Sequence, residues 1–112
     1  MSDNAADLAA LRKIHEDCTL LREGGVPVAL LRSFGFRAGN DDQRMDLLLF
    51  PSQHSGYVTR LFFEKALEGR GRSQNWHQHR VIDRNWWAPS WQNVPVSLPW
   101  PAMLCAHLEA VA

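Results

Sequence analysis

Between residues 19 and 63 the chain alternates short apolar runs with turns of glycine and polar residues. Glu23-Gly24-Gly25 divides the first two runs, and glycine suits a hairpin turn because it adopts positive φ without strain. Residues 39–42 mark the next turn. Four short strands with such short connections are typical of an antiparallel meander. The predicted strands are residues 19–22, 26–34, 45–50 and 57–63.

Helical patterns flank the predicted strands. Residues 4–16 place an apolar residue at every third position, which predicts a helix with a narrow apolar stripe. Near the C-terminus, Pro101 suits the first turn of a helix, and a one-sided apolar stripe follows it. We therefore predict a second helix over residues 100–111.

The stretch between the last predicted strand and the second helix lacks regular periodicity. Residues 68–73 are rich in glycine and arginine, and residues 74–95 are rich in Trp, Asn, Gln and His. Four of the five tryptophans lie between Trp76 and Trp91. A buried tryptophan contributes roughly 150–250 Å² of contact, enough to anchor an irregular segment. We expect a long irregular segment that these tryptophans hold against the sheet.

The length and charge of the chain limit the number of domains and the classes of partner that we expect. At 112 residues the chain is expected to be one α+β domain over residues 1–112. Twelve basic and twelve acidic side chains cancel, so neither nucleic acid nor an anionic membrane is an expected partner. No apolar run approaches the ~20 residues of a membrane span. Cys18 and Cys105 form no CxxC pair, and we expect a reducing, cytoplasmic setting.

The sequence Trp76-His77-Gln78-His79 has the most reactive side chains. Histidines two positions apart on an extended segment point the same way and can share a metal ion. The interpretation that we favour needs no metal: one histidine packs among the tryptophans and the other faces solvent. Further ligands would have to come from Asp83, His54 or His107.

The possible nucleophiles have weak support. His15 stands three positions before Cys18, but nothing in the sequence orients it as a base. Cys105 falls within the apolar stripe of the second helix, so we expect a small buried side chain. Ser73 stands six residues before His79, which permits a serine–histidine arrangement without indicating one.

Several motifs, in this order, resemble the ubiquitin-conjugating-enzyme (UBC) superfamily. LLLFPSQHSGY (residues 47–57) resembles the strand that enters that superfamily's "FP…YP" loop, and NWWAPSWQNVP (residues 85–95) its "WxP" segment. NWHQHR (residues 75–80), followed by WWAP and a leucine-striped helix, is similar to prokaryotic UBC family E of ubiquitin-like conjugation operons. The resemblance covers about residues 8–112.

The resemblance implies a UBC-like fold and a site. Its elements would be an N-terminal helix, a four-strand meander, a long tryptophan-rich active-site segment and a C-terminal helix. In UBC enzymes the cysteine stands eight residues before the tryptophan of "WxP", and the same spacing from Trp87 reaches His79. The resemblance thus implies His79 as the reacting residue, with His77 and Ser73 as accompanying catalytic candidates and no cofactor.

The chain departs from the superfamily pattern in ways that affect the chemistry. It has no cysteine at His79 and no histidine-proline-asparagine signature near Gly69, while Thr59 and Arg60 replace the paired prolines. Three alternatives remain: His79 accepts an acyl group, His79 acts as a general base for a hydroxyl, or the site is inactive.

The resemblance implies a ubiquitin-like protein and its adenylating activating enzyme as partners. One hypothesis is a bacterial UBC-like component that receives the ubiquitin-like protein and hands it on without a catalytic cysteine. A second is an inactive UBC-like adaptor that binds the same partners. A third is an unrelated small α+β domain whose tryptophan-rich segment binds a ligand.

Overall fold

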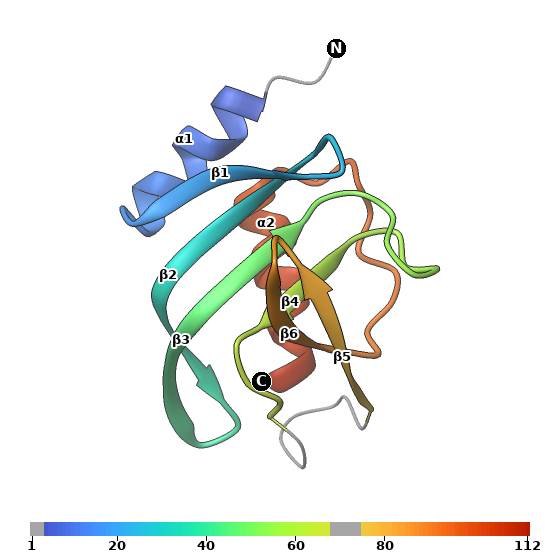
Figure 1. The fold of residues 1–112 in the computed structure, drawn as a ribbon. Coiled ribbons are helices and arrows are strands. Elements are labelled where there is room, and N and C mark those ends of the chain that lie inside the picture. Colours follow the sequence, from blue (N-terminus) through green and yellow to red (C-terminus); the bar gives the residue numbers. More distant parts are fainter. Residues whose placement is uncertain (1–3, 68–74) are drawn as a thin grey trace.

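The computed structural model describes residues 4–67 and 75–112. These residues form a helix, six strands and a C-terminal helix that continues into a 3-10 turn (Figure 1). In chain order the elements are α1 (Asn4–Ile14), β1 (Cys18–Glu23), β2 (Val26–Ala38), β3 (Asp41–Phe50), β4 (Arg60–Phe63), β5 (Trp76–Val81), β6 (Arg84–Pro89), α2 (Trp100–Leu108) and η1 (Glu109–Val111).

The six strands form one antiparallel sheet in the order β1-β2-β3-β4-β6-β5. The α+β class and the meander of the first four strands are confirmed. The strand bounds differ from the prediction, because β2 continues to Ala38 and β4 begins only at Arg60. A register shift between Leu31 and Phe34 interrupts the β2–β3 ladder, where Ser33 adopts a positive φ of 48°.

The expectation of four strands followed by an irregular segment is wrong. Trp76–Val81 and Arg84–Pro89 pair as a hairpin, joined by Ile82 and Asp83. Both turn residues have positive φ, 49° and 59°, as a two-residue type I′ turn requires. The sequence has no glycine at this turn, so the usual signal for such a hairpin is missing.

Both helices cover the same face of the sheet. Leu11 of α1 and Met103 and Leu104 of α2 are fully buried in one core cluster, which also contains Leu47 and Phe63 of the sheet. In Figure 1, α2 lies behind the strands. None of the helices in the described residues is long and apolar enough to cross a membrane.

The β5–β6 hairpin folds over the other face of the sheet. Only one residue pair, Phe63 with Trp87, joins β6 to β4, so the hairpin can turn away from the meander. Trp86 is fully buried in a second core cluster together with Leu48 and Phe62. In Figure 1 the hairpin crosses in front of β3 and β4. The sheet therefore curls, and the second core fills the space inside the curl.

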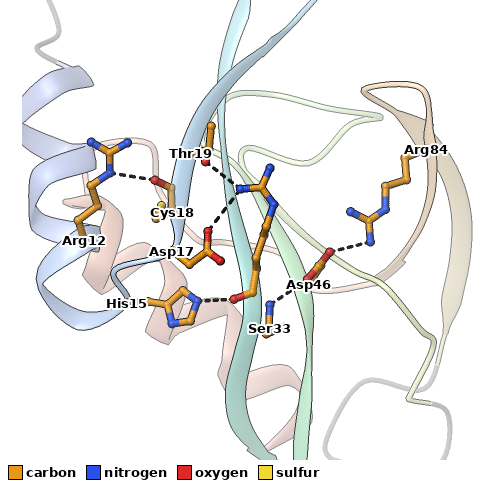
Figure 2. A network of polar contacts seen from close by, with 9 residues as sticks. Arg12, His15, Asp17, Cys18, Thr19, Ser33, Asp46 and Arg84 are labelled. Carbon is orange, nitrogen blue, oxygen red and sulfur yellow. Dashed lines mark hydrogen bonds and ion pairs between the residues drawn. The ribbon is translucent and has the colours of Figure 1, made fainter.

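Polar contacts brace this curl at two places. At the hairpin turn, the backbone N–H of Ile82 donates to Oε1 of Glu23 at the end of β1 (3.2 Å). Asp46 of β3 accepts from the backbone N–H of Ser33 (2.8 Å) and pairs with Arg84 of β6 (2.9 Å), as Figure 2 shows. Partial burial raises the pKa of Asp46, but these two donors outweigh burial and leave the pKa below its ordinary value.

Candidate functional site

A cluster of polar and aromatic side chains lies beside the second core cluster, where the hairpin meets β4. Arg60 and Phe62 alternate along β4 and so share a face of the sheet. On β5, His79 occupies the position opposite Trp86, and opposed residues of antiparallel strands lie on the same face. The loop between β3 and β4 contributes His54 and Tyr57. The candidate site consists of His54, Tyr57, Arg60 and His79, grouped around Phe62.

Arg60 lies at the centre of this site and is only 3% exposed. Its guanidinium carbon lies 4.0 Å from the centroid of the Tyr57 ring, a cation–π distance. One terminal nitrogen, Nη1, donates to Nε2 of His79 and the other, Nη2, to the carbonyl oxygen of Pro89, both at 3.4 Å. None of the carboxylates in the described residues forms an ion pair with Arg60. Burial lowers the pKa of Arg60, and the neighbouring Tyr57 opposes that shift.

His79 is half-buried and held in a neutral state. Burial lowers its pKa below the ordinary value, and the positive charge of Arg60, followed by His54 and His77, lowers it further. An arginine nitrogen can only donate, so Nε2 of His79 must be the acceptor in the 3.4 Å contact. The ring proton of His79 therefore resides on Nδ1, and near neutral pH the lone pair of Nε2 faces Arg60 across this long 3.4 Å contact.

His54 completes the site from a tight turn. Its backbone pairs with that of Tyr57 through two 2.9 Å hydrogen bonds, with Ser55 and Gly56 at positive φ between them. The His54 ring lies 5.3 Å from the ring of His79. Burial first, and then Arg60, lowers the pKa of His54. Its Nδ1 atom is buried and makes no hydrogen bond.

Of the two predicted catalytic residues that the structure describes, His79 lies in this cluster and His77 does not. His77 is exposed and shares the strand face of His79, as the spacing of two predicts. Ser73 lies outside the described residues, as does the whole glycine- and arginine-rich stretch 68–73. Within residues 4–67 and 75–112, no group of three or more His, Cys, Asp or Glu side chains could hold a metal ion.

The two cysteines lie away from the site. Cys18 is buried in the core cluster on the opposite face of the sheet, and its burial raises the pKa of the thiol. Figure 2 shows that Arg12 donates to the carbonyl oxygen of Cys18 (2.9 Å) rather than approaching its sulfur. The expectation that Cys105 is buried is wrong, because it lies on the outer side of α2 and is exposed.

His107 has a structural role on the helix-covered face. Its Nε2 lies 2.8 Å from the hydroxyl oxygen of Thr59, which in turn donates to the carbonyl oxygen of Val94 (2.8 Å). The single hydroxyl proton serves Val94, so His107 must donate from Nε2. Burial lowers the pKa of His107 to about 4, with a smaller effect from Arg60. A neutral His107 thus ties α2 to β4.

Sequence reasoning considered His54 only as a metal ligand and treated Arg60 only as a departure from a motif. The detectable signal was an arginine within the apolar strand Arg-Leu-Phe-Phe, at the position that alternates with the inward-facing Phe62. An arginine at an inward position of a strand requires a partner or a ligand. No family model, curated protein or solved structure matches this chain.

Proposed function

We propose that this chain is a UBC-like component of a bacterial ubiquitin-like conjugation system. It would receive a ubiquitin-like protein from an adenylating activating enzyme and hand it on without a catalytic cysteine. The main support is the state of His79, the residue that the motif spacing selects. It is half-buried in a cluster with Arg60 and His54, and its ring is neutral near neutral pH.

A neutral imidazole in this position suits general base catalysis of acyl transfer. The incoming acyl group is the activated C-terminus of the ubiquitin-like protein, carried as a thioester by the activating enzyme. His79 takes the proton from an attacking hydroxyl or amine as the new C–O or C–N bond forms and the C–S bond breaks. The proton then passes from His79 to the leaving thiolate, so the base is regenerated.

The hairpin is consistent with this role because it holds His79 on a regular strand. His79 pairs with Trp86, whose ring is fully buried and whose Nε1 donates to the carbonyl oxygen of Val81 (3.1 Å). A base on a braced strand is positioned more closely than one on a long loop. The hairpin is also where the chain departs from the four-strand meander of the UBC resemblance, so the fold assignment forms part of the proposal.

A second candidate is an inactive adaptor that binds the same two partners. The observation that favours it is the position of both thiols, since Cys18 is buried on the opposite face and Cys105 lies on α2. A chain without a thiol at its site cannot form the thioester intermediate of cysteine-bearing enzymes.

A reconstituted reaction separates the two candidates. The activating enzyme, ATP and the ubiquitin-like protein would be combined with wild-type chain, with His79→Ala, or with Gln78→Ala as a matched control. Gln78 is an exposed neighbour on the same strand with its side chain on the other strand face. We expect His79→Ala to slow transfer roughly 10²–10⁴-fold while the complex still assembles. Transfer by His79→Ala at the wild-type rate would support the adaptor.

A further inference from the structure

No carboxylate of the described residues balances the positive charge of the buried Arg60. A buried charge is costly unless an opposite charge or a full set of hydrogen bonds compensates it. The arginines that form ion pairs in the described residues are more exposed: Arg32 pairs with Asp17, Arg37 with Asp42, and Arg84 with Asp46. Arg60 is 3% exposed and pairs with no carboxylate of the described residues.

The hydrogen-bonding capacity around Arg60 is also unfilled. A guanidinium has five N–H donors, yet Arg60 makes only two hydrogen bonds with the described residues. Each is 3.4 Å long, beyond the usual 2.7–3.2 Å. Nearby, Nδ1 of His54 is buried without a hydrogen-bond partner. The unused N–H groups of Arg60 could therefore donate hydrogen bonds to a ligand.

The contacts of Arg60 restrict how a ligand would bind it. The Tyr57 ring lies over one face of the guanidinium at 4.0 Å, so an acceptor would have to bind in the plane of the N–H groups. His79, which Nη1 contacts, is only half-buried, and His77 beside it on the same face of β5 is exposed. An acceptor would therefore approach Nη1 from the side of His79, and the side chains that cover Arg60 would have to move, because Arg60 is only 3% exposed.

We propose that Arg60, together with His54 and His79, binds a carboxylate, namely the C-terminal carboxylate of a protein chain. A single guanidinium beside two neutral imidazoles and the rings of Tyr57 and Phe62 balances one negative charge. The planar fork of arginine matches a carboxylate, whereas a doubly charged phosphate needs further cations. The choice of a protein C-terminus rests on the proposed function, in which the end of a ubiquitin-like protein lies at this site. That end has a free carboxylate before its activation and after hydrolysis of the thioester.

The probe is the dipeptide glycylglycine, compared with glycylglycinamide, which lacks the carboxylate. Thermal unfolding of the full chain would be followed at constant ionic strength with each compound up to about 100 mM, which is on the order of 100 times a millimolar dissociation constant. We expect the unfolding midpoint of the wild type to rise with glycylglycine and not with the amide. Histidine NMR signals of His54 and His79 should shift in the same titration.

Arg60→Met is the test variant and Arg80→Met is its control, because Arg80 is exposed on β5 and bonds within its own hairpin. We expect Arg60→Met to be at least as stable as the wild type without ligand, since an unbalanced buried charge is removed. Its midpoint should no longer respond to glycylglycine, whereas Arg80→Met should respond as the wild type does.

Several outcomes would overturn this inference. If glycylglycine neither raises the wild-type midpoint nor moves the two histidine signals, the site binds no carboxylate. Inorganic phosphate as effective as the dipeptide would indicate a general anion site. Acetate as effective as the dipeptide would remove the assignment to a chain terminus. The proposed function fails separately: transfer by His79→Ala at the wild-type rate would refute the catalytic role of His79, whatever glycylglycine does to the unfolding midpoint of the wild type.

Discussion

Nη1 of Arg60 lies 3.4 Å from Nε2 of His79, although the two residues are 19 positions apart in the sequence. The contact exists because the hairpin that contains His79 folds back over the sheet beside β4. Its consequence is electrostatic: burial lowers the pKa of His79, and a fixed cation beside the imidazole lowers that pKa further. His79 is therefore unprotonated at neutral pH, while Arg60 keeps a charge that the described residues do not balance.

The positions of the cysteines predict that they are dispensable for activity. A Cys18→Ser, Cys105→Ser double variant should transfer or bind its partners as the wild type does, because neither thiol lies in the cluster around Arg60. Cys18→Ser introduces a hydroxyl into a core cluster, so a modest loss of stability is expected and would be checked by denaturant unfolding. Loss of activity in the folded Cys18→Ser protein would show that the reacting centre lies elsewhere.

Trp86 should be the tryptophan on which stability depends most. Trp86 is 0% exposed, against 4% for Trp100 and 7% for Trp76, while Trp87 and Trp91 are only partly buried. Trp86→Ala should lower the free energy of unfolding by about 3–5 kcal/mol, measured by denaturant unfolding. Trp86→Phe retains most of the apolar contact and loses the hydrogen bond to Val81, so its loss should be smaller. An unchanged midpoint for Trp86→Ala would mean that other contacts hold the hairpin.

His107 should make stability fall in acid. Its pKa in the folded protein is about 4, against an ordinary value of 6.5, so the unfolded chain binds the proton more readily. The stabilisation is complete above pH 6.5 and is lost as the pH falls toward 4, by about 3 kcal/mol in total. Denaturant unfolding across this range would measure the slope.

His54 and His79 also have lowered pKa values, so they change stability with pH in the same direction as His107. The His107→Gln variant is therefore needed to isolate the contribution of His107. The difference between wild type and His107→Gln should contain only the part due to His107. Equal slopes for the two proteins between pH 6.5 and 4 would contradict a buried, neutral His107.

The meander was predictable from sequence because its turns contain the residues that turns usually require. Gly24 and Gly25 have φ values of 55° and 83°, and a positive φ is what glycine adopts without strain. The β5–β6 hairpin was not predictable in this way. Its turn places Ile82, a β-branched residue, at a positive φ of 49°, a conformation that β-branched residues rarely adopt. In the folded chain the backbone N–H of Ile82 donates to Glu23, a contact that the local sequence does not predict.

The site was predictable only in part, for a related reason. His79 follows from the motif resemblance, but its neighbours depend on the curl of the sheet. Arg60 and His54 come close to His79 only when the hairpin folds over the face that carries Phe62. Without knowledge of the hairpin, the sequence does not predict that His54 and His79 lie close together.

The central claim, that a neutral His79 is the base of acyl transfer, is tested most directly by the pH dependence of transfer. Single-turnover rates would be measured with saturating, preformed thioester of the activating enzyme, for wild type and His79→Ala. Because burial and Arg60 lower the pKa of His79, the wild-type rate should rise with pH through a midpoint below 6.5 and then level off. His79→Ala should be slower and should lack this limb. The same rise in both proteins, at similar rates, would contradict the claim.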